Sequence, residues 1–514
     1  MVRERHNSSG GAVNSGQEYD VIVVGGGPAG STVSTLVRKR GHRVLLLEKE
    51  SFPRYQIGES LLPATVHGIA HLLGVHEELR DAGFTVKHGG TFKWGANPEP
   101  WTFDFAVSRR MAGPTSFAYQ VERMKFDHIL LENARKHGVE VSEQCTVTDV
   151  LKSADRAEGV RYTDAEGAVH EARARYVVDA SGNSSRIYAA ADSRREYSTF
   201  FRNLALFGYF EGGKRLSAPS SGNILSVAFD NGWFWYIPLT PEITSVGAVV
   251  NQESASLVQG DPAKAMRGFV QSCPLIADML AEATPVTEGP YGQFRVRKDW
   301  SYCNTRFFAP GMVLVGDAAC FVDPVFSSGV HLATYSGLLA ARSINACLEA
   351  GDEGAGEGIG EQAAFEEFEQ RYRREYGLFY EFLVGFYEMH ESEDSYFWRA
   401  RKLSDSAGSD IEAFVELVGG VSSGEFDGGG TATERIAAGT RDMTRMVAGA
   451  EEHADGAVIG AAAGKLLEQG TALQARALVG SQAGEGRSIT PGGLSASADG
   501  LSWVRDDGAG VDAR

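Results

Sequence analysis

Three glycines near the N-terminus, Gly25, Gly27 and Gly30, have the spacing of a loop that binds phosphates. In the pattern G-x-G-x-x-G, the first glycine permits a tight turn after a strand. The second lets a pyrophosphate approach the backbone, and the third lets the next helix pack closely on the strand. The pyrophosphate of a dinucleotide then lies at the helix N-terminus. The spacing predicts chemistry that depends on a bound dinucleotide, and this loop alone would suit a dehydrogenase equally well.

The segments on either side of the loop have the pattern of a β-α-β unit. Residues 19–24 form an apolar run typical of a buried strand, residues 31–40 can form a helix, and residues 43–48 read as a second strand. Glu48 follows the loop at about the 20-residue distance at which an acid binds a ribose hydroxyl. This acid favours an adenosine without a 2′-phosphate.

The rest of the chain predicts a second layer and a helical end. Residues 175–181 resemble a parallel strand with a polar carboxyl end, and residues 203–251 alternate as in an antiparallel sheet over the cofactor. Residues 312–317 return to the first sheet, and a helix runs from about 329 to 349. The aromatic stripe in the helical region 365–403 is interpreted as core. We predict an α/β fold, Rossmann-like, with an antiparallel-sheet substrate layer and a helical C-terminal region.

Shifts in composition predict the domain boundaries. Residues 1–18 are expected to be a disordered leader, and residues 19–350 a cofactor and substrate module whose substrate sheet spans about 200–300. Residues 351–419 form the helical C-terminal region, and residues 420–514 a Gly/Ala-rich tail. The tail is expected to hold a weak helix at 451–467 and, over roughly its last thirty residues, to be disordered.

Charge and cysteine usage exclude several classes of protein. The net charge of −18 argues against general binding to nucleic acid or to an anionic membrane. The five cysteines contain no C-x-x-C pair, so we expect neither a metal site nor a disulfide framework. The first eighteen residues have no apolar core and no later run is long enough to span a bilayer. These features predict a cytoplasmic protein.

Three separated pieces of the chain fit one family template. The glycine loop, the Asp-Ala-Ser-Gly strand end at residues 179–182 and the pair Gly316-Asp317 together resemble the FAD-binding domain of flavoprotein monooxygenases. The resemblance implies FAD as the cofactor, with Asp317 at its ribityl or pyrophosphate region and Arg123 also in contact. It implies further cofactor contacts at Pro28, Ala29, Gly329 and Val330.

A narrower resemblance comes from the substrate layer. The pattern W-x-W-x-I-P at residues 233–238 is similar to the signature of flavin-dependent halogenases, and Lys87 follows the Gly-Glu-Ser segment 58–60 where that family has its essential lysine. The resemblance covers roughly residues 20–403. It implies that Trp233 and Trp235 separate substrate from flavin and so suppress direct hydroxylation.

The resemblance also implies a reaction. Reduced FAD (FADH2) and O2 give a flavin hydroperoxide, chloride attacks it, and hypochlorous acid travels to the substrate. Ser328 and Gly329, which open the long helix, match the family's halide-binding pair, because a helix N-terminus holds an anion without a tightly binding cation. Lys87 would hydrogen-bond hypochlorous acid or become a chloramine, and burial would leave its amine partly neutral and nucleophilic. Lys93 is the alternative assignment.

One position departs from the tryptophan-specific branch of the family. That branch has P-L-E-S-T-G, whereas residues 324–329 here read P-V-F-S-S-G, so that Phe326 replaces the glutamate. This change favours a phenolic ring, which its hydroxyl already activates. The aromatic stretch 391–398 resembles the phenol-acting branch of natural-product and antibiotic biosynthesis, some of whose members take a substrate tethered to a carrier protein. Glu59 and His331 are candidate bases by proximity only, and His331 is interpreted as structural.

Two other functions fit parts of the pattern. An FAD-dependent aromatic hydroxylase would share the glycine loop and Gly316-Asp317 but would not need the tryptophan pair or the lysine. A non-catalytic flavin-binding or docking protein could use the C-terminal aromatic helices as its surface. The remaining chain shows no second glycine loop for a nicotinamide, so we predict that a separate flavin reductase supplies reduced FAD.

Overall fold

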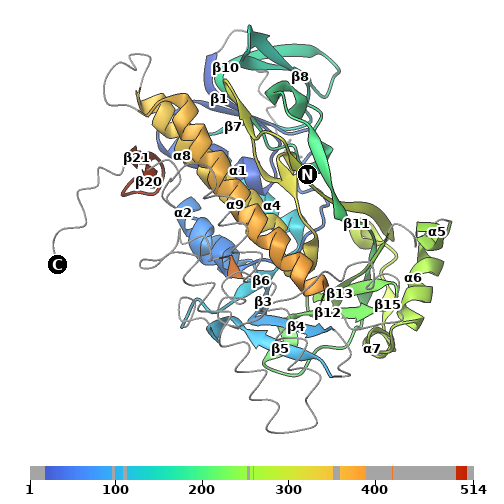
Figure 1. Ribbon diagram of the computed structural model, residues 1–514. Helices are drawn as coiled ribbons and strands as arrows, with labels where there is room; N and C mark the ends of the chain where they lie inside the picture. The colour runs from blue at the N-terminus through green and yellow to red at the C-terminus, as the bar shows by residue number, and fades with distance from the viewer. Residues whose placement is uncertain are drawn as a thin grey trace, which may run out of the picture.

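The computed structural model describes residues 18–94, 99–107, 113–251, 255–258, 260–350, 359–388, 419–420 and 494–505. Two sheets lie beside a pair of long helices (Figure 1). The strands are β1 Glu18–Val24, β2 Val44–Leu47, β3 Thr85–Lys87, β4 Gly89–Lys93, β5 Trp101–Asp104, β6 Ala118–Gln120, β7 Glu140–Ser142, β8 Thr146–Ser153, β9 Arg156–Thr163, β10 Val169–Asp179, β11 Arg195–Glu211, β12 Ile224–Phe229, β13 Gly232–Pro238, β14 Ile243–Asn251, β15 Thr284–Pro285, β16 Arg295–Asn304, β17 Phe308–Ala309, β18 Met312–Leu314, β19 Cys320–Phe321, β20 Leu494–Ala496 and β21 Trp503–Arg505. The helices are α1 Pro28–Lys39, α2 Ala70–Leu73, α3 His76–Asp81, α4 Arg123–Lys136, α5 Ala255–Val258, α6 Pro262–Gln271, α7 Pro274–Met279, α8 Gly329–Ala350 and α9 Glu361–Glu388.

The first sheet holds the predicted dinucleotide unit. Its strands β18, β10, β1, β2 and β7 lie in this order and run parallel, while β17 closes one edge and β8 and β9 extend from β10 as antiparallel strands. Val21, Ile22 and Val23 of β1 are fully buried, as expected of a parallel strand covered on both faces. The Rossmann-like fold expected from the sequence is therefore confirmed.

The second sheet has the order β19-β16-β11-β14-β13-β12-β4-β5, with β15 paired to β11, and is antiparallel apart from the β12–β4 pair. Side chains alternate along β13. Trp233 and Trp235 belong to the main core, whereas Phe234 and Tyr236 pack into a second cluster with residues of α6 and α7. This two-residue period turns the tryptophans towards the first sheet.

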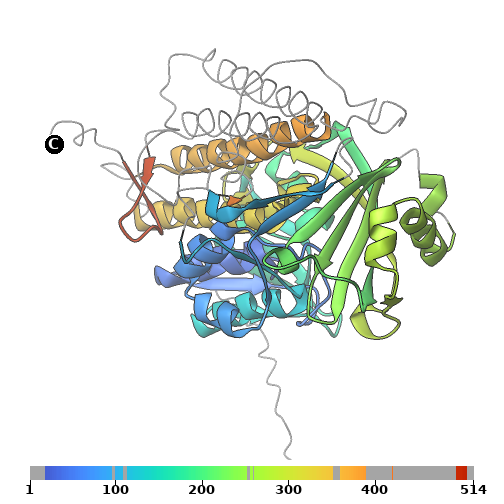
Figure 2. The same cartoon turned by 90° about the horizontal axis from the view of Figure 1, so that it is seen from below.

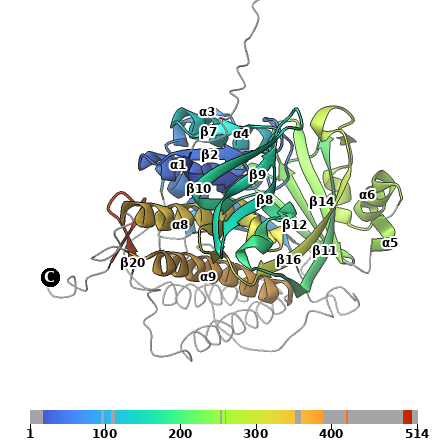
Figure 3. The same ribbon diagram turned by 90° about the horizontal axis from the view of Figure 1, so that it is seen from above.

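Helices α8 and α9 lie side by side, with α8 between α9 and the first sheet (Figures 2 and 3). Phe365, Phe368, Tyr372, Phe379 and Leu383 of α9 are almost completely buried. The aromatic stripe is therefore core, as interpreted from the sequence. The predicted helical residues 389–403 lie outside the described residues, and no described helix is long and apolar enough to cross a membrane.

The segment 85–93 forms two short strands, β3 and β4, which belong to different sheets. Gly89 and Gly90 lie inside β4, and His88 is the single residue between the two strands. A Cβ at Gly89 would stand 1.8 Å from the Phe103 carbonyl oxygen, and one at Gly90 would meet the Phe103 ring at 2.7 Å. The glycines are there because β5 approaches closely. As a result, β3 pairs with β6 and β4 joins the second sheet.

An ordered hairpin lies within the stretch expected to be disordered. Strands β20 and β21 pair and dock beside the end of α8 (Figure 1). The Trp503 indole donates to the Ser343 hydroxyl at 2.9 Å, and the guanidinium groups of Arg342 and Arg371 lie over its ring, 5.1 and 4.9 Å from the centroid. The prediction of disorder is wrong for residues 494–505, because one buried tryptophan anchors the hairpin. The weak helix at 451–467 lies outside the described residues.

Candidate active site

The glycine loop leaves no room for side chains at two of its three positions. Gly25 follows β1 with φ of +106°, and a Cβ there would lie 2.5 Å from the Ala180 carbonyl oxygen. A Cβ at Gly30 would lie 1.9 Å from the Gly25 carbonyl oxygen. The loop therefore crosses the carboxyl ends of β1 and β10, which is where open α/β sheets bind ligands.

Gly27 has an open position at the N-terminus of α1. A Cβ there would meet a single neighbour, the Arg54 Nη2 atom at 3.4 Å. Arg54 also donates from Nη1 to Asp127 at 2.7 Å, so its cation is held beside the helix N-terminus. A guanidinium and a helix N-terminus on one glycine suit a pyrophosphate. Sequence reasoning missed Arg54, which lies in the segment 54–63 that follows β2.

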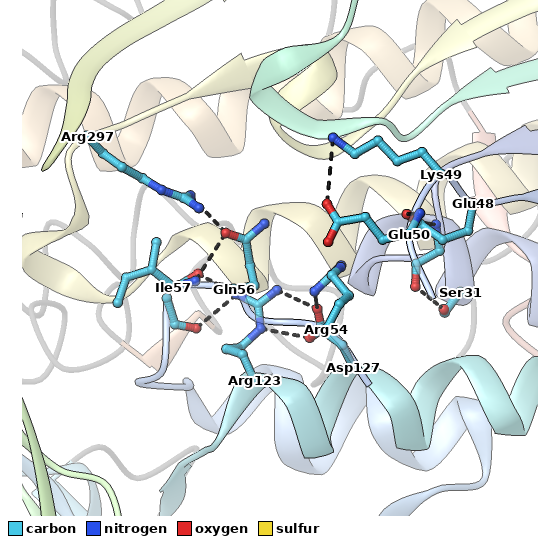
Figure 4. A network of polar contacts seen from close by, with 12 residues as sticks. Ser31, Glu48, Lys49, Glu50, Arg54, Gln56, Ile57, Arg123, Asp127 and Arg297 are labelled. Atoms are coloured by element: carbon cyan, nitrogen blue, oxygen red, sulfur yellow. Dashed lines mark hydrogen bonds and ion pairs between the residues drawn. The ribbon is translucent and has the colours of Figure 1, made fainter. Parts of the chain in front are cut away.

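Arg123 fastens that segment to α4. Its Nε and Nη2 atoms donate to the Asp127 carboxylate at 2.7 and 2.9 Å, and its Nη1 atom donates to the carbonyl oxygens of Ile57 and Gly58 at 2.7 and 3.1 Å. In Figure 4, Arg123 and Arg54 both point towards Asp127. The structure assigns these bonds to the protein itself, so the expected contact of Arg123 with FAD stays a prediction.

Glu48 directly follows β2, and its side chain points back at the glycine loop. Its carboxylate accepts from the Gly26 amide at 2.6 Å and from the Glu50 amide at 2.9 Å, and it is buried. Each carboxylate oxygen has two lone pairs, so a ribose hydroxyl can still donate to this group. The ribose contact of Glu48 stays a prediction.

The Gly316-Asp317 turn meets the glycine loop. A Cβ at Gly316 would lie 3.2 Å from that of Ala29, the second residue of α1. Burial raises the pKa of the Asp317 carboxyl to about 6, while the charges of Arg123, Arg297 and Arg195 oppose that shift. The structure therefore brings together two pieces that are almost 300 residues apart in the sequence, with three cations around the acid.

These features fit FAD, because the loop offers a glycine cradle, a helix N-terminus with open space at Gly27 and flanking guanidinium groups. We expect Gly27→Ala to fold normally and to bind FAD about tenfold more weakly, since an added methyl group in a packed site costs roughly 1–3 kcal/mol. FAD titration of the apoprotein by flavin fluorescence measures this. Gly268→Ala in α6, where a Cβ meets nothing within 4 Å, is the matched control. Equal affinity of both variants would contradict the assignment.

Lys87 is buried at the end of β3. Its ammonium donates to the Ser60 hydroxyl at 2.8 Å and to the Leu61 carbonyl oxygen at 3.0 Å, and it lies 5.6 Å from the Phe105 ring centroid. Residues 59–61 run beside β6, the partner of β3. Only 1% of Lys87 is exposed, and burial lowers the pKa of its amine to about 7. The alternative, Lys93, is only partly buried.

Glu59 is the buried acid of the same segment. Its carboxylate accepts from the Tyr209 hydroxyl at 2.7 Å, and Tyr209 in turn bonds to the Tyr55 hydroxyl at 2.8 Å. Burial raises the pKa of the Glu59 carboxyl to about 7, while the hydroxyls of Ser245 and Tyr209 and the Arg123 charge oppose the shift. Trp235 donates to the Ser245 hydroxyl at 3.2 Å. Glu59 thus contacts one tryptophan of the motif through a single hydroxyl.

The raised pKa of Glu59 makes folding stability depend on pH. Between its ordinary pKa of 4.5 and about 7 the folded state binds the extra proton, so the stability of the wild-type protein falls as the pH rises through this window. We expect Glu59→Gln to remove that loss and to gain up to roughly 3 kcal/mol over wild type at pH 8. Urea unfolding at pH 5 and 8 tests this. Glu50→Gln, at an exposed position, is the control, and its free energy of unfolding relative to wild type should be the same at pH 5 and pH 8. If Glu59→Gln also shows no change between the two pH values, the assignment of the raised pKa to Glu59 is wrong.

The two motif tryptophans are adjacent and buried. Their ring centroids lie 6.2 Å apart, and a Cβ at Gly247 would stand 2.2 Å from the Trp235 ring. Trp233 donates from its indole nitrogen to the Tyr387 hydroxyl at 2.5 Å, and Tyr387 donates to Asp323 at 2.7 Å. This chain of bonds ties β13 to α9 and to the turn before α8, so both indoles have fixed orientations.

Phe326 lies in an aromatic wall. Its ring contacts Phe386 at 4.7 Å, Phe382 at 5.2 Å and Phe92 at 6.2 Å. Ring contacts continue from Phe92 through Phe103 to Phe105, the ring that faces Lys87. Sequence reasoning missed this wall, which β4, β5 and α9 build together. It also missed Glu381 of α9, whose carboxyl pKa burial raises to about 7.

Ser328 lies directly before α8 and is completely buried. Its hydroxyl has no hydrogen-bond partner among the described residues, and its carbonyl oxygen accepts from the Leu332 amide at 2.9 Å. An orphaned buried hydroxyl beside the amides of Gly329 and Val330, which the first turn of a helix leaves without a partner inside that helix, suits a small anion. His331, one position further, bonds to the buried Glu375 at 3.0 Å, which agrees with a structural role.

A glycine loop and a Gly-Asp turn on a parallel sheet, beneath an antiparallel sheet, define an FAD-binding protein of the monooxygenase-like class. A model of the tryptophan halogenase family matches residues 20–113 and 108–433. The chain belongs to this family of flavin-dependent halogenases.

Individual relatives agree with this placement. Tryptophan 2-halogenase of Chondromyces crocatus is 34% identical over 388 residues, covering 75% of this chain and 70% of that protein. Sulochrin halogenase of Aspergillus terreus is 33% identical over 353 residues, covering 63% of each. Among solved structures, the myxobacterial chondrochloren halogenase CndH is 50% identical with a TM-score of 0.75, covering 95% of this chain and all of that one. The halogenase CmlS is 35% identical with a TM-score of 0.68, covering 76% of this chain and 68% of that one.

The chain is therefore an oxidoreductase that uses FAD, O2 and halide. Flavin-dependent halogenases generally need a separate flavin reductase and act on small molecules.

Proposed function

We propose that this halogenase chlorinates a phenolic ring in natural-product biosynthesis, and that Lys87 transfers the chlorine. The single observation that carries the proposal is the burial of Lys87 beside an aromatic wall in which Phe326 stands. When bound, reduced FAD supplies the activated oxygen that oxidises halide to hypohalous acid. The protein's own residues then govern where that oxidant goes.

Lys87 is the group that meets the oxidant. Burial lowers the pKa of its amine to about 7, so that near neutral pH about half of the amines carry a lone pair. Attack of the amine nitrogen on hypochlorous acid forms an N–Cl bond and releases water. The ring carbon then takes the chlorine, and the ring proton returns the nitrogen to an amine. In the alternative, Lys87 holds hypochlorous acid by a hydrogen bond while the ring attacks it.

The other proposed site residues bind and separate the reactants. Ser328 and Gly329 would hold chloride at the start of α8, and the fixed indoles of Trp233 and Trp235 would keep substrate from the flavin. FAD would be held by Arg54 and by the predicted set Gly25, Gly27, Pro28, Ala29, Gly30, Glu48, Arg123, Asp317, Gly329 and Val330. We also propose the domain boundaries predicted from the sequence, with residues 19–350 as the FAD-binding and substrate module and residues 351–419 as the helical C-terminal region.

The substrate assignment rests on the surroundings of Phe326. Within the described part of the chain, the rings of Phe92, Phe382 and Phe386 that contact it are all apolar, and this environment suits an aromatic side chain better than a carboxylate. A ring activated by its own hydroxyl needs less help in losing its proton. A phenol, free or tethered to a carrier protein, therefore suits this wall better than an indole does.

Product mass tests the proposal. The protein should be supplied with FAD, a reductase, O2 and chloride, and offered free phenols, carrier-bound phenols and tryptophan. We expect a chlorinated phenol. Chlorination of tryptophan alone would overturn the substrate assignment, and a gain of oxygen without chlorine would favour a hydroxylase.

A further inference from the structure

Two cysteines far apart in the sequence face each other across the strand pair β16–β19. Cys303 and Cys320 are direct cross-strand partners. In the next pair, the Asn304 amide donates to the Ala319 carbonyl oxygen at 2.9 Å. Because pairs alternate in an antiparallel ladder, Cys303 and Cys320 form a non-hydrogen-bonded pair, in which Cα atoms lie about 4.5 Å apart. This separation is within the range of roughly 4.4–6.8 Å that a disulfide spans.

Both thiols point to the same side, towards α9. The Arg373 Nη1 atom lies 3.2 Å from the Cys303 sulfur, and the side chain of Tyr372 contacts Cys320. Cys320 is 1% exposed, whereas Cys303 is only partly buried. Burial raises the pKa of both thiols, and the Arg373 charge lowers that of Cys303. Cys303 is thus the more reachable sulfur and the one with a cation beside it.

The pair sits at the base of the Gly316-Asp317 turn. The Tyr302 hydroxyl donates to the Asp317 carbonyl oxygen at 2.6 Å, and the Tyr372 hydroxyl donates to the Gly316 carbonyl oxygen at 3.2 Å. Cys320 follows Asp317 by three residues and pairs with β16, which Tyr302 also belongs to. A covalent bond between β16 and β19 would therefore fix the turn that meets the glycine loop.

We propose that Cys303 and Cys320 are a redox modification site that a peroxide converts from a dithiol to a disulfide. The Cys303 thiolate attacks one oxygen of hydrogen peroxide, the O–O bond breaks, and the leaving hydroxide takes a proton to become water. The Cys320 thiolate then attacks the oxidised Cys303 sulfur, and a second water leaves. Two thiols lose two electrons and two protons, and one peroxide becomes two waters. This site does not depend on the identity of the halogenated substrate.

All five cysteines are free thiols in the structure. The other three can therefore be compared with Cys303 and Cys320 for their reaction with peroxide in the same experiment. The FAD-loaded protein should be treated with stepwise hydrogen peroxide, blocked with N-ethylmaleimide while native, and digested without reductant. We expect a cross-linked peptide pair that contains Cys303 and Cys320, lighter by two hydrogens and lost on reduction. A cross-link between other cysteines, or modification of Cys145 or Cys347 while this pair stays reduced, would overturn the proposal.

Single variants separate the two steps. With Cys320→Ser, the first step should stop at a Cys303 sulfenic acid that dimedone traps, and Cys303→Ser should abolish the cross-link. Cys347→Ser in α8 is the matched control and should retain it. Amide hydrogen exchange across residues 316–321 gives a second readout, because the bond should slow exchange there only in the oxidised protein. Unchanged exchange after oxidation would show that the bond does not fix the turn.

Discussion

We expect Lys87→Met to lower halogenation by roughly 10²–10⁴-fold, the range in which a positioned proton-transfer or nucleophilic group acts. Methionine has nearly the length of lysine and no nitrogen, so it fills the same apolar space without the amine. FAD affinity should not change, since Lys87 bonds only to Ser60 and Leu61 in the described part of the chain. Product yield by mass spectrometry and flavin titration measure the two effects separately.

The same variant should be more stable than wild type. The amine is charged in the unfolded chain below pH 10.5 and has a folded pKa of about 7, so burial costs stability throughout this range. Stability of the wild-type protein should therefore rise with pH from about 7 towards 10.5, and the advantage of Lys87→Met should shrink. Lys93→Met on β4 is the control, and we expect it to halogenate at the wild-type rate. A Lys87→Met protein that binds FAD and chlorinates at the wild-type rate would exclude the proposed role.

The pH profile of chlorination separates the two forms of the mechanism. A neutral Lys87 amine that forms a chloramine becomes more abundant as pH rises through about 7, so the rate should rise and then level off. A charged Lys87 that only donates a hydrogen bond becomes scarcer over the same window, so the rate should fall. Single-turnover rates at saturating chloride, between pH 6 and 8.5, distinguish these outcomes.

Local patterns predicted those parts of the site that one segment carries alone. The glycine loop, the long helix after Ser328 and the alternation of Trp233 and Trp235 depend on residues close in sequence, and the structure has them where they were expected. The Rossmann-like sheet follows from apolar runs of the right length.

Features that need several segments were not predictable in this way. The position of Arg54 beside Gly27 depends on its ion pair with Asp127 of α4. The contact of Phe326 with Phe92 depends on residues 89–93 forming the strand β4. The pairing of Cys303 with Cys320 likewise depends on strand register, which cysteine spacing does not report. The hairpin at 494–505 follows a long Gly/Ala-rich stretch, and the composition of that stretch predicted disorder. Composition does not report that a single residue, Trp503, bonds to a distant helix.

We expect Ser328→Ala to raise the KM for chloride at least tenfold, because hydrogen bonds to charged groups contribute about 1.5–3 kcal/mol. The buried Ser328 hydroxyl has no partner among the described residues, so its removal leaves no other group unsatisfied. An anion there also meets the free amides at the start of α8. The effect should therefore appear in halide affinity, while kcat at saturating chloride stays close to the wild-type value.

Ser34→Ala provides the matched control for this test. Ser34 is another fully buried serine whose hydroxyl has no partner among the described residues, but it lies within α1. A helix interior offers no free amides to an anion, so Ser34→Ala should leave the chloride dependence unchanged. If both variants shift KM equally, the effect is one of packing. If neither shifts it, chloride binds elsewhere, and the orphaned hydroxyl of Ser328 has another purpose. A shift confined to Ser328→Ala would place the halide at the start of α8, next to the turn that carries Phe326.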